Sequence, residues 1–119
     1  MLIRDYLESR RIPFRTVLHG PARSASRRAR AMHKPGRLVA KAVLLNGERG
    51  FVLAVLPSTH RIDLDRLRGC LSDPFVRLAT EKEIDAVFQD CEPGALPPFG
   101  RLYGLRTLVD SRLVGIVEI

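Results

Sequence analysis

A lysine in the middle of an apolar segment is the residue of this sequence best suited to chemistry. Lys41 stands within residues 38–45, which are expected to form a strand. Side-chain alternation places Lys41 on the same face of that strand as Val39 and Val43. An ammonium group in such surroundings is costly unless it finds a partner or reaches a cleft. Such lysines bind anions or carbonyl oxygens, or have altered acidity. The competing interpretation is a lysine that extends to water from a frayed strand end.

A loop rich in proline and glycine, residues 92–100, is the second feature with chemical potential. Proline fixes the backbone φ angle, and glycine permits close approach of the backbone to a ligand. A rigid loop of this kind can present backbone N–H groups to a ligand oxygen, as oxyanion holes do. Loops of this composition also serve simply as connections between elements.

The other ligands and nucleophiles form no known motif. The spacing of His19, His33 and His60 fits no metal site. Cys70 and Cys91 make neither a disulfide framework nor a zinc site. Cys91, beside the loop, could serve as a nucleophile, but no base is evident near it in the sequence. There is no Ser-His-Asp pattern, nucleophile elbow, phosphate-binding loop or dinucleotide fingerprint. We therefore expect neither a metal nor a cofactor.

Length and composition limit the class of protein. The chain has 119 residues, 45% of them hydrophobic and 28% charged, which predicts one domain over residues 1–119. That apolar content is too high for a disordered tail. No apolar run approaches the roughly 18 residues needed to span a bilayer, and the N-terminus lacks the pattern of a signal peptide. We expect a cytoplasmic protein without a membrane partner.

The positive charge is concentrated at one end of the chain. Residues 1–37 contain ten Lys or Arg and two acidic residues, whereas the rest contains ten basic and eleven acidic residues. A basic surface attracts polyanions, and arginine suits phosphate oxygens. The sequence leaves two interpretations open, contact with nucleic acid or a composition that only maintains solubility.

The elements that would position these residues alternate between helices and strands. Apolar periodicity predicts helices at 2–11, 22–33, 62–70 and 81–89, and strands at 14–18, 38–45, 51–56, 76–79, 103–109 and 113–119. The Asn-Gly pair at Asn46 predicts a hairpin between the two central strands, which are apolar on both faces and therefore expected at the centre of the sheet. Thr80 and Glu83 form a capping box. The fold class is α/β or α+β, a single domain with a mixed sheet flanked by helices.

Several segments together carry a resemblance to a known family. They are Tyr6-Leu7, Ile12-Pro13, His19 before an alanine-rich helix, Val39-Ala40-Lys41-Ala42-Val43, Leu53 to Pro57, Arg61 to Leu64, Arg77 to Thr80, Gly94 to Gly100, and Val109-Asp110. In this order they resemble the YbaK/EbsC family, the prolyl-tRNA-synthetase-associated editing domain and its free-standing relatives. The most specific part is the lysine in an apolar strand, followed about fifty positions later by Gly-x-x-x-Pro.

The resemblance implies a twisted mixed sheet flanked by helices and an activity in trans. Such enzymes hydrolyse the ester that links a wrongly attached small amino acid, such as cysteine, alanine or proline, to tRNA. Water attack is assisted by the ribose 2′-hydroxyl, without a cofactor. The implied partners are mischarged tRNA and an aminoacyl-tRNA synthetase. The implied site comprises Lys41 and Gly94 as catalytic residues, His19, Ala95, Leu96, Pro97 and Pro98 as substrate contacts, and Arg23, Arg27, Arg28 and Arg30 as tRNA contacts.

The end of the sequence departs from the family pattern. Relatives continue into another strand, a small-residue turn that helps to line the pocket, and a last strand and helix, whereas this sequence stops at Ile119. We therefore expect a domain that is short at its C-terminus. Its last strand would be an unpaired sheet edge, which leaves a homodimer open. The alternative function is a non-catalytic tRNA- or synthetase-binding module of the same fold.

Overall fold

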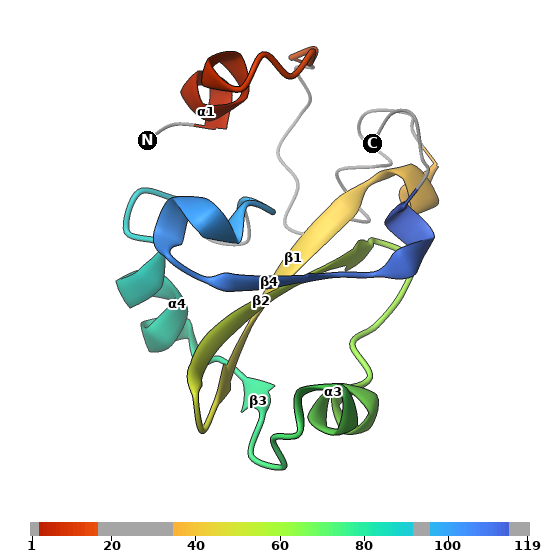
Figure 1. The fold of residues 1–119 in the computed structure, drawn as a ribbon, viewed down its shortest axis with the longest axis vertical. Coiled ribbons are helices and arrows are strands. Elements are labelled where there is room, and N and C mark those ends of the chain that lie inside the picture. Colours follow the sequence, from red (N-terminus) through yellow and green to blue (C-terminus); the bar gives the residue numbers. More distant parts are fainter. Residues whose placement is uncertain (1–2, 17–34, 92–95, 115–119) are drawn as a thin grey trace.

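A hairpin forms the centre of the structure. The computed structural model describes residues 3–16, 35–91 and 96–114. Strand β1 (Ala40–Gly47) pairs with β2 (Gly50–Pro57) in antiparallel register along its whole length. The short strand β3 (Arg77–Leu78) pairs antiparallel with β1, and β4 (Arg106–Val109) pairs parallel with β2, which gives the order β3-β1-β2-β4 (Figure 1). The predicted mixed sheet is confirmed.

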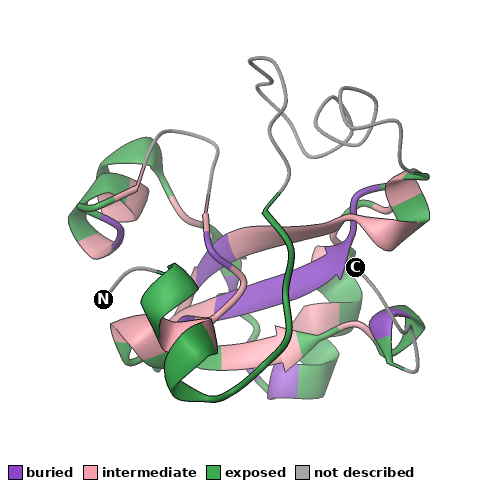
Figure 2. Ribbon diagram, turned by 90° about the horizontal axis from the view of Figure 1, so that it is seen from above, coloured by how far each residue is buried: buried purple, intermediate pink, exposed green. Residues whose placement is uncertain are grey.

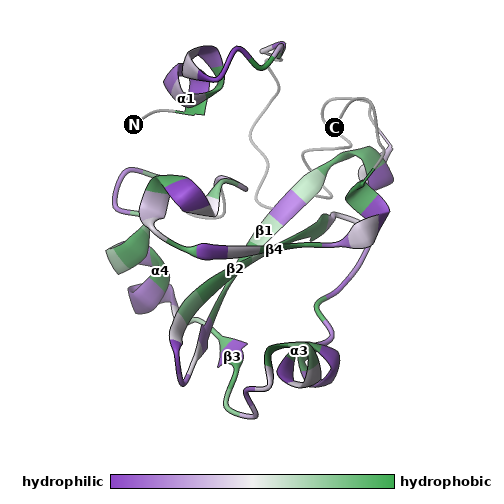
Figure 3. Ribbon diagram, in the orientation of Figure 1, coloured by the Kyte–Doolittle hydropathy of each residue, from purple (hydrophilic) through white to green (hydrophobic). Residues whose placement is uncertain are grey.

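The two faces of the sheet each carry a core. On one face, helix α4 (Glu81–Val87) and the following Phe88 cover a cluster centred on Leu44, Leu53 and Val55. On the other face, helix α3 (Leu64–Leu71) covers a cluster of Leu45, Ala54, Leu71 and Val76. Two residues in the middle of β1 and most of β2 are buried, and both strands are mainly hydrophobic (Figures 2 and 3). This confirms the single α+β domain and the central place of the hairpin.

The hairpin turn lies inside the predicted connection 46–50 and is shorter than predicted. Asn46 pairs with Phe51 and Gly47 pairs with Gly50, so the connecting residues are Glu48 and Arg49. Gly47 is needed for another reason. A Cβ there would collide with the carboxylate of Asp73, which is buried and accepts hydrogen bonds from the backbone N–H groups of Glu48 at 2.9 Å and Phe75 at 3.0 Å. The close approach of Asp73 therefore selects glycine at this position.

Helices α3 and α4 each begin at a residue whose side chain caps the helix. Asp63 accepts from the backbone N–H of Arg66 at the start of α3. At the start of α4, the backbone N–H of Glu83 donates to Thr80 Oγ1 and the Thr80 N–H donates to Glu83 Oε1, which is the predicted capping box. Glu83 also accepts hydrogen bonds from Asn46 of β1 and Arg77 of β3, so one carboxylate joins α4 to two strands.

Three predicted elements differ from the structure, and a fourth lies outside its described part. Residues 14–16, predicted as the start of a strand, have irregular structure. The predicted strand 103–109 is a 3₁₀ helix (Gly100–Tyr103) followed by the shorter β4. The start of the predicted strand 113–119 is not paired in the sheet, because Leu113 ends a 3₁₀ helix (Ser111–Leu113) and Val114 is the residue that follows it. The first helix, α1 (Ile3–Ser9), is present, whereas the helix predicted at 22–33 lies outside the described residues.

The Glu83 network makes the stability of the fold dependent on pH. Hydrogen bonds from Arg77 and from the Thr80 backbone lower the pKa of Glu83 from 4.5 to about 2. Because the pKa in the folded chain lies below its usual value, the stabilisation is present above pH 4.5 and is lost as the pH falls towards 2. In urea unfolding measured over this range, Glu83→Gln should lower the free energy of unfolding at neutral pH, and its difference from wild type should shrink on acidification.

The matched control is Glu81→Gln, which removes an exposed carboxylate from the same first turn of α4. It should leave the pH dependence as in wild type. Parallel pH curves for wild type and Glu83→Gln would contradict the role given to the network.

Candidate functional site

Lys41 lies near the beginning of β1, half-buried and opposite Leu56 of β2. Its neighbours Ala40 and Ala42 pack in the cluster under α4, whereas Val43 packs in the cluster under α3. Alternation along the strand therefore directs the Lys41 side chain to the α3 face. Within the described part of the chain, its ammonium group makes no hydrogen bond or ion pair. A half-buried cation in this position is available to a ligand.

The described end of the predicted loop lies on the opposite face. Leu96 packs in the cluster under α4, Pro97 is buried, and Pro98 lines a cavity on that face. Gly94 and Ala95 lie outside the described residues, so the part of the loop predicted to meet Lys41 is not placed. The structure places Leu96 and Pro98 on the α4 face, and the approach of the loop to Lys41 stays a prediction because residues 92–95 lie outside the described ranges.

Other predicted site residues also fall outside the described ranges. They are the substrate contact His19 and the tRNA contacts Arg23, Arg27, Arg28 and Arg30. Their roles remain predictions. Among the residues that the structure does describe, no group of three or more His, Cys, Asp or Glu is arranged to hold a metal ion. Within the same ranges, no helix is both long and apolar enough to cross a membrane.

A polar cluster holds the residues before the loop against those after it. The hydroxyl of Tyr103 donates to Asp90 Oδ1 at 2.8 Å and lies 3.3 Å from the sulfur of Cys91. The Tyr103 ring packs on Phe88, with ring centroids 4.6 Å apart. The hydrogen bond from Tyr103 lowers the pKa of Asp90, while burial raises the pKa of the Tyr103 hydroxyl. Tyr103 therefore fixes the chain at Asp90–Cys91 next to the 3₁₀ helix that follows the loop.

The electrostatics of this cluster do not activate Cys91. Burial raises the pKa of the Cys91 thiol, and the neighbouring Asp90 carboxylate raises it further. The thiol donates to Asp90 at 3.4 Å, so it is held protonated beside a negative charge. A reactive thiol needs the opposite conditions, a lowered pKa and a positive neighbour. Cys91 has the properties of a structural cysteine.

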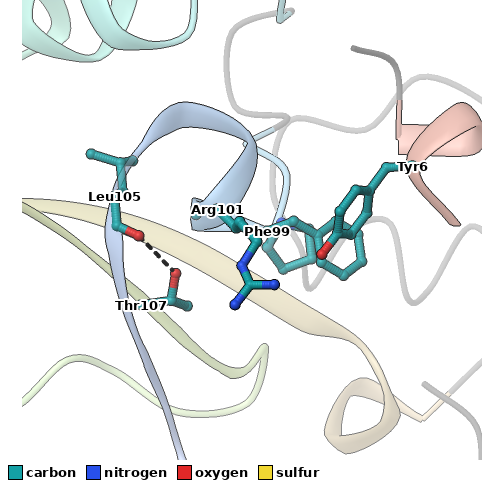
Figure 4. A pocket seen from close by; sticks show the side chains of 7 residues that line it. Tyr6, Phe99, Arg101, Leu105 and Thr107 are labelled. Atoms are coloured by element: carbon teal, nitrogen blue, oxygen red, sulfur yellow. Dashed lines mark hydrogen bonds between the residues drawn. The ribbon is translucent and has the colours of Figure 1, made fainter. Parts of the chain in front are cut away.

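A cavity of about 360 Å³ lies between α1, the residues after the loop and β4 (Figure 4). Its lining comprises Tyr6, Pro98, Phe99, Gly100, Arg101, Leu105 and Thr107. Except for Pro98, none of these residues was identified as a site residue from the sequence. The signal that was available is the Phe99-Gly100-Arg101 segment directly after the proline pair, where an aromatic ring and a cation flank a glycine.

Removal of the Tyr103 hydroxyl tests the polar cluster. Tyr103→Phe deletes the hydrogen bond to the Asp90 carboxylate and should lower the free energy of unfolding. The measurement is urea denaturation followed by circular dichroism. Tyr6→Phe is the matched control, because no hydrogen bond of the Tyr6 hydroxyl is found among the described residues. Equal stability of Tyr103→Phe and wild type would show that the cluster does not hold the chain in place.

Three solved structures are similar to this chain over 96% of its length. One, from work on epitope backbone grafting onto scaffold proteins by computational design, is 25% identical with a TM-score of 0.79, and 73% of that chain is covered. A candidate trans-editing enzyme for prolyl tRNA synthetase is 27% identical with a TM-score of 0.78, again with 73% covered. Hypothetical protein APE2540 shares the fold, with 19% identity, a TM-score of 0.84 and 76% covered. No curated protein matches the chain.

A family comparison agrees with these structural similarities. The model of the aminoacyl-tRNA editing domain matches residues 19–119, which is most of the chain. The matched span contains Lys41, the loop from Gly94 to Pro98, and the whole of the sheet. The chain therefore belongs to the aminoacyl-tRNA editing domain family, the YbaK family that its sequence resembles, and its role lies in tRNA editing.

Proposed function

We propose that this protein is a trans-acting deacylase that hydrolyses the ester of mischarged tRNA. The observation that carries the proposal is the match of the editing-domain family over residues 19–119, a span that includes a half-buried lysine without a protein partner in the described ranges. The substrate would be tRNA carrying a small amino acid such as cysteine, alanine or proline. The likeness to a candidate trans-editing enzyme for prolyl tRNA synthetase supports this choice.

The reaction adds one water molecule across the ester. Water attacks the carbonyl carbon, the carbonyl oxygen becomes an oxyanion, and the bond to the ribose oxygen then breaks. The products are the free amino acid and tRNA with a free terminal hydroxyl. The neighbouring ribose 2′-hydroxyl would assist the water. The raised pKa of the Cys91 thiol makes the thiol next to the loop poorly suited to act as a nucleophile.

Lys41 would act by binding and orienting the aminoacyl-adenosine end. Its position between Ala40 and Ala42 in a strand buried on both faces restricts the directions that its side chain can take. A cation held in apolar surroundings interacts more strongly with an oxygen ligand than a cation in water does. Keeping the Lys41 ammonium half-buried without a described protein partner costs free energy, and this cost supports a functional role for the residue.

Within the loop from Gly94 to Pro98, the backbone N–H groups of the residues before the two prolines would donate to the developing oxyanion, because proline has no backbone N–H. Gly94 is the candidate catalytic residue of the loop, and Ala95, Leu96, Pro97 and Pro98 would contact the substrate. The anchoring of Asp90 and Cys91 by Tyr103 on one side and the packing of Leu96 on the other support a rigid loop. One well-placed donor of this kind is worth roughly 3 kcal/mol of transition-state stabilisation.

The basic N-terminal third would contact the tRNA outside the reaction centre. Arg23, Arg27, Arg28 and Arg30 would bind phosphates of the acceptor stem, with His19 closer to the substrate. An aminoacyl-tRNA synthetase is the second partner that an editing role implies. Phosphate contacts of this type predict binding that weakens as salt rises.

The decisive experiment follows ester loss from Ala-tRNA and Cys-tRNA carrying the proline anticodon. Wild type should accelerate the loss above the uncatalysed rate, and Lys41→Ala should reduce kcat/KM by about 100-fold, the size of effect seen on removal of one electrostatic contact to the transition state. Lys82→Ala is the matched control, because Lys82 is an exposed lysine of α4. It should retain wild-type activity.

Two results would contradict parts of the proposal, the first the deacylase activity and the second the role of Lys41. Hydrolysis at the uncatalysed rate by folded wild type that still binds tRNA would favour the non-catalytic binding module of the same fold. Equal activity of Lys41→Ala and Lys82→Ala would remove Lys41 from the site. Circular dichroism of each variant separates these outcomes from a loss of folding.

A further inference from the structure

The end of the hairpin that carries Lys41 is closed by a residue that belongs to neither strand. Strand β2 ends at Pro57, which pairs with Ala40 and has no backbone N–H to donate. The next residue, Ser58, donates its backbone N–H to the carbonyl oxygen of Val39 at 2.8 Å. This bond extends the ladder one position beyond the start of β1, so Lys41 lies two residues inside the last hydrogen bond of the hairpin.

The side chain of Ser58 makes a second contact with the same stretch of backbone. Its hydroxyl donates to the carbonyl oxygen of Gly36 at 2.6 Å. The same oxygen accepts the backbone N–H of Val39 at 3.0 Å, at the end of the 3₁₀ helix Gly36–Leu38. Both backbone groups of Val39 are therefore held, the N–H by Gly36 and the carbonyl by Ser58. We refer to these three hydrogen bonds as the Ser58 clamp.

Burial makes the clamp difficult for water to replace. Ser58 is only 4% exposed, and a hydroxyl removed from water needs a hydrogen-bond partner because burial is otherwise costly. The position of the acceptor is restricted as well. A Cβ at Gly36 would lie 3.0 Å from Ser58 Oγ and 2.9 Å from Cγ2 of Thr59. The close approach of the two backbone segments therefore favours glycine on one side and a small hydroxyl residue on the other.

The clamp bears directly on the two interpretations that the sequence leaves open for Lys41. One is a cation held in apolar surroundings, and the other is a lysine that extends to water from a frayed strand end. Fraying of β1 from its start would have to break both hydrogen bonds of Ser58 before it reached the pair of Lys41 and Leu56. The clamp therefore favours the first interpretation.

We propose that Ser58 is a positioning residue for Lys41 in the deacylation reaction. Ser58 does not touch the substrate. It acts through the backbone of β1, which it holds at Val39, so that the Lys41 ammonium keeps one orientation toward the aminoacyl-adenosine end. A group misplaced by about 1 Å loses up to about 100-fold in rate, so a contact that fixes orientation has a measurable effect. This inference rests on the role proposed for Lys41.

A double-mutant cycle on deacylation tests the positioning role. Ser58→Ala removes the bond to Gly36 and should lower kcat/KM for mischarged Ala-tRNA about tenfold in the wild-type background. In the Lys41→Ala background, measured at enzyme concentrations where its residual rate exceeds the uncatalysed one, the same substitution should change kcat/KM by less than about twofold. The reason is that no ammonium group remains to be oriented. A purely structural role would lower activity by the same factor in both backgrounds.

Two controls separate this effect from a lost hydroxyl and from lost stability. Ser9→Ala removes an exposed serine of α1 whose hydroxyl also donates to a backbone carbonyl, that of Tyr6 at 2.7 Å. Glu83→Gln weakens the other end of β1, where Glu83 accepts from Asn46, about 17 Å of strand from Lys41. Both variants should keep kcat/KM within about twofold of wild type.

Hydrogen exchange gives a readout that needs no hydrolysis. Ser58→Ala should speed exchange of the backbone amides of Val39 and of position 58 about fivefold, because both exchange by local opening of this end of the ladder. The amide of Asp73, bonded to the carbonyl of Arg68 at 3.0 Å near the hairpin turn, should exchange at the wild-type rate. Gly36→Ala crowds the Ser58 hydroxyl from the opposite side and should have the same effect as Ser58→Ala, so the test does not depend on one variant.

The two measurements assign each failure to one proposal. Equal losses of activity in both backgrounds, or wild-type activity of Ser58→Ala in an active enzyme, overturn the positioning role and leave the deacylase proposal intact. Wild-type exchange at Val39 in both Ser58→Ala and Gly36→Ala overturns the clamp. Faster exchange at Val39 in a chain that hydrolyses nothing supports the clamp as a structural contact, overturns the deacylase proposal and removes the positioning role with it.

Discussion

Burial of the β1–β2 hairpin on both faces is the constraint on which the rest of the structure depends. Leu44 and Leu53 face the core under α4, while Leu45 and Ala54 face the core under α3. A slip of one residue in the pairing would exchange these faces, so two cores together fix one register. The same register determines the face to which Lys41 is directed. The position of the candidate cation is thus a consequence of hydrophobic packing elsewhere in the strand.

The sequence predicted those parts of the fold whose signals are local or strongly periodic. The central hairpin, α3 and the capping box of α4 were all recognisable, because apolar spacing and cap residues act within a few positions of each other. The predicted connection, residues 46–50, contains the turn, but the sequence could not show that Asn46 and Gly47 continue β1, because the residue that selects Gly47 is Asp73, far along the chain. Residues 14–16 have the composition of a strand. A strand also needs a partner to pair with, and composition does not reveal whether one is present.

The candidate site stays a prediction, because Gly94, Ala95 and the predicted tRNA contacts lie outside the described residues. Lys41 was identified because a cation between apolar residues is unusual, and alternation assigned it to one face. The sequence could not indicate which face the residues after the loop would cover, because that depends on the packing of Leu96 and on the parallel pairing of β4. The contact between the Tyr6 and Phe99 rings was missed for the same reason. Tyr6 and Phe99 come from opposite ends of the chain and meet only in the folded domain.

The attachment of α1 has a consequence for the local stability of the domain. None of the described residues of α1 is buried, and the Tyr6 ring packs on Phe99 of the sheet domain. Elements that bury little surface open locally at a small fraction of the global unfolding free energy. Local opening of α1 therefore leaves both hydrophobic cores of the sheet intact.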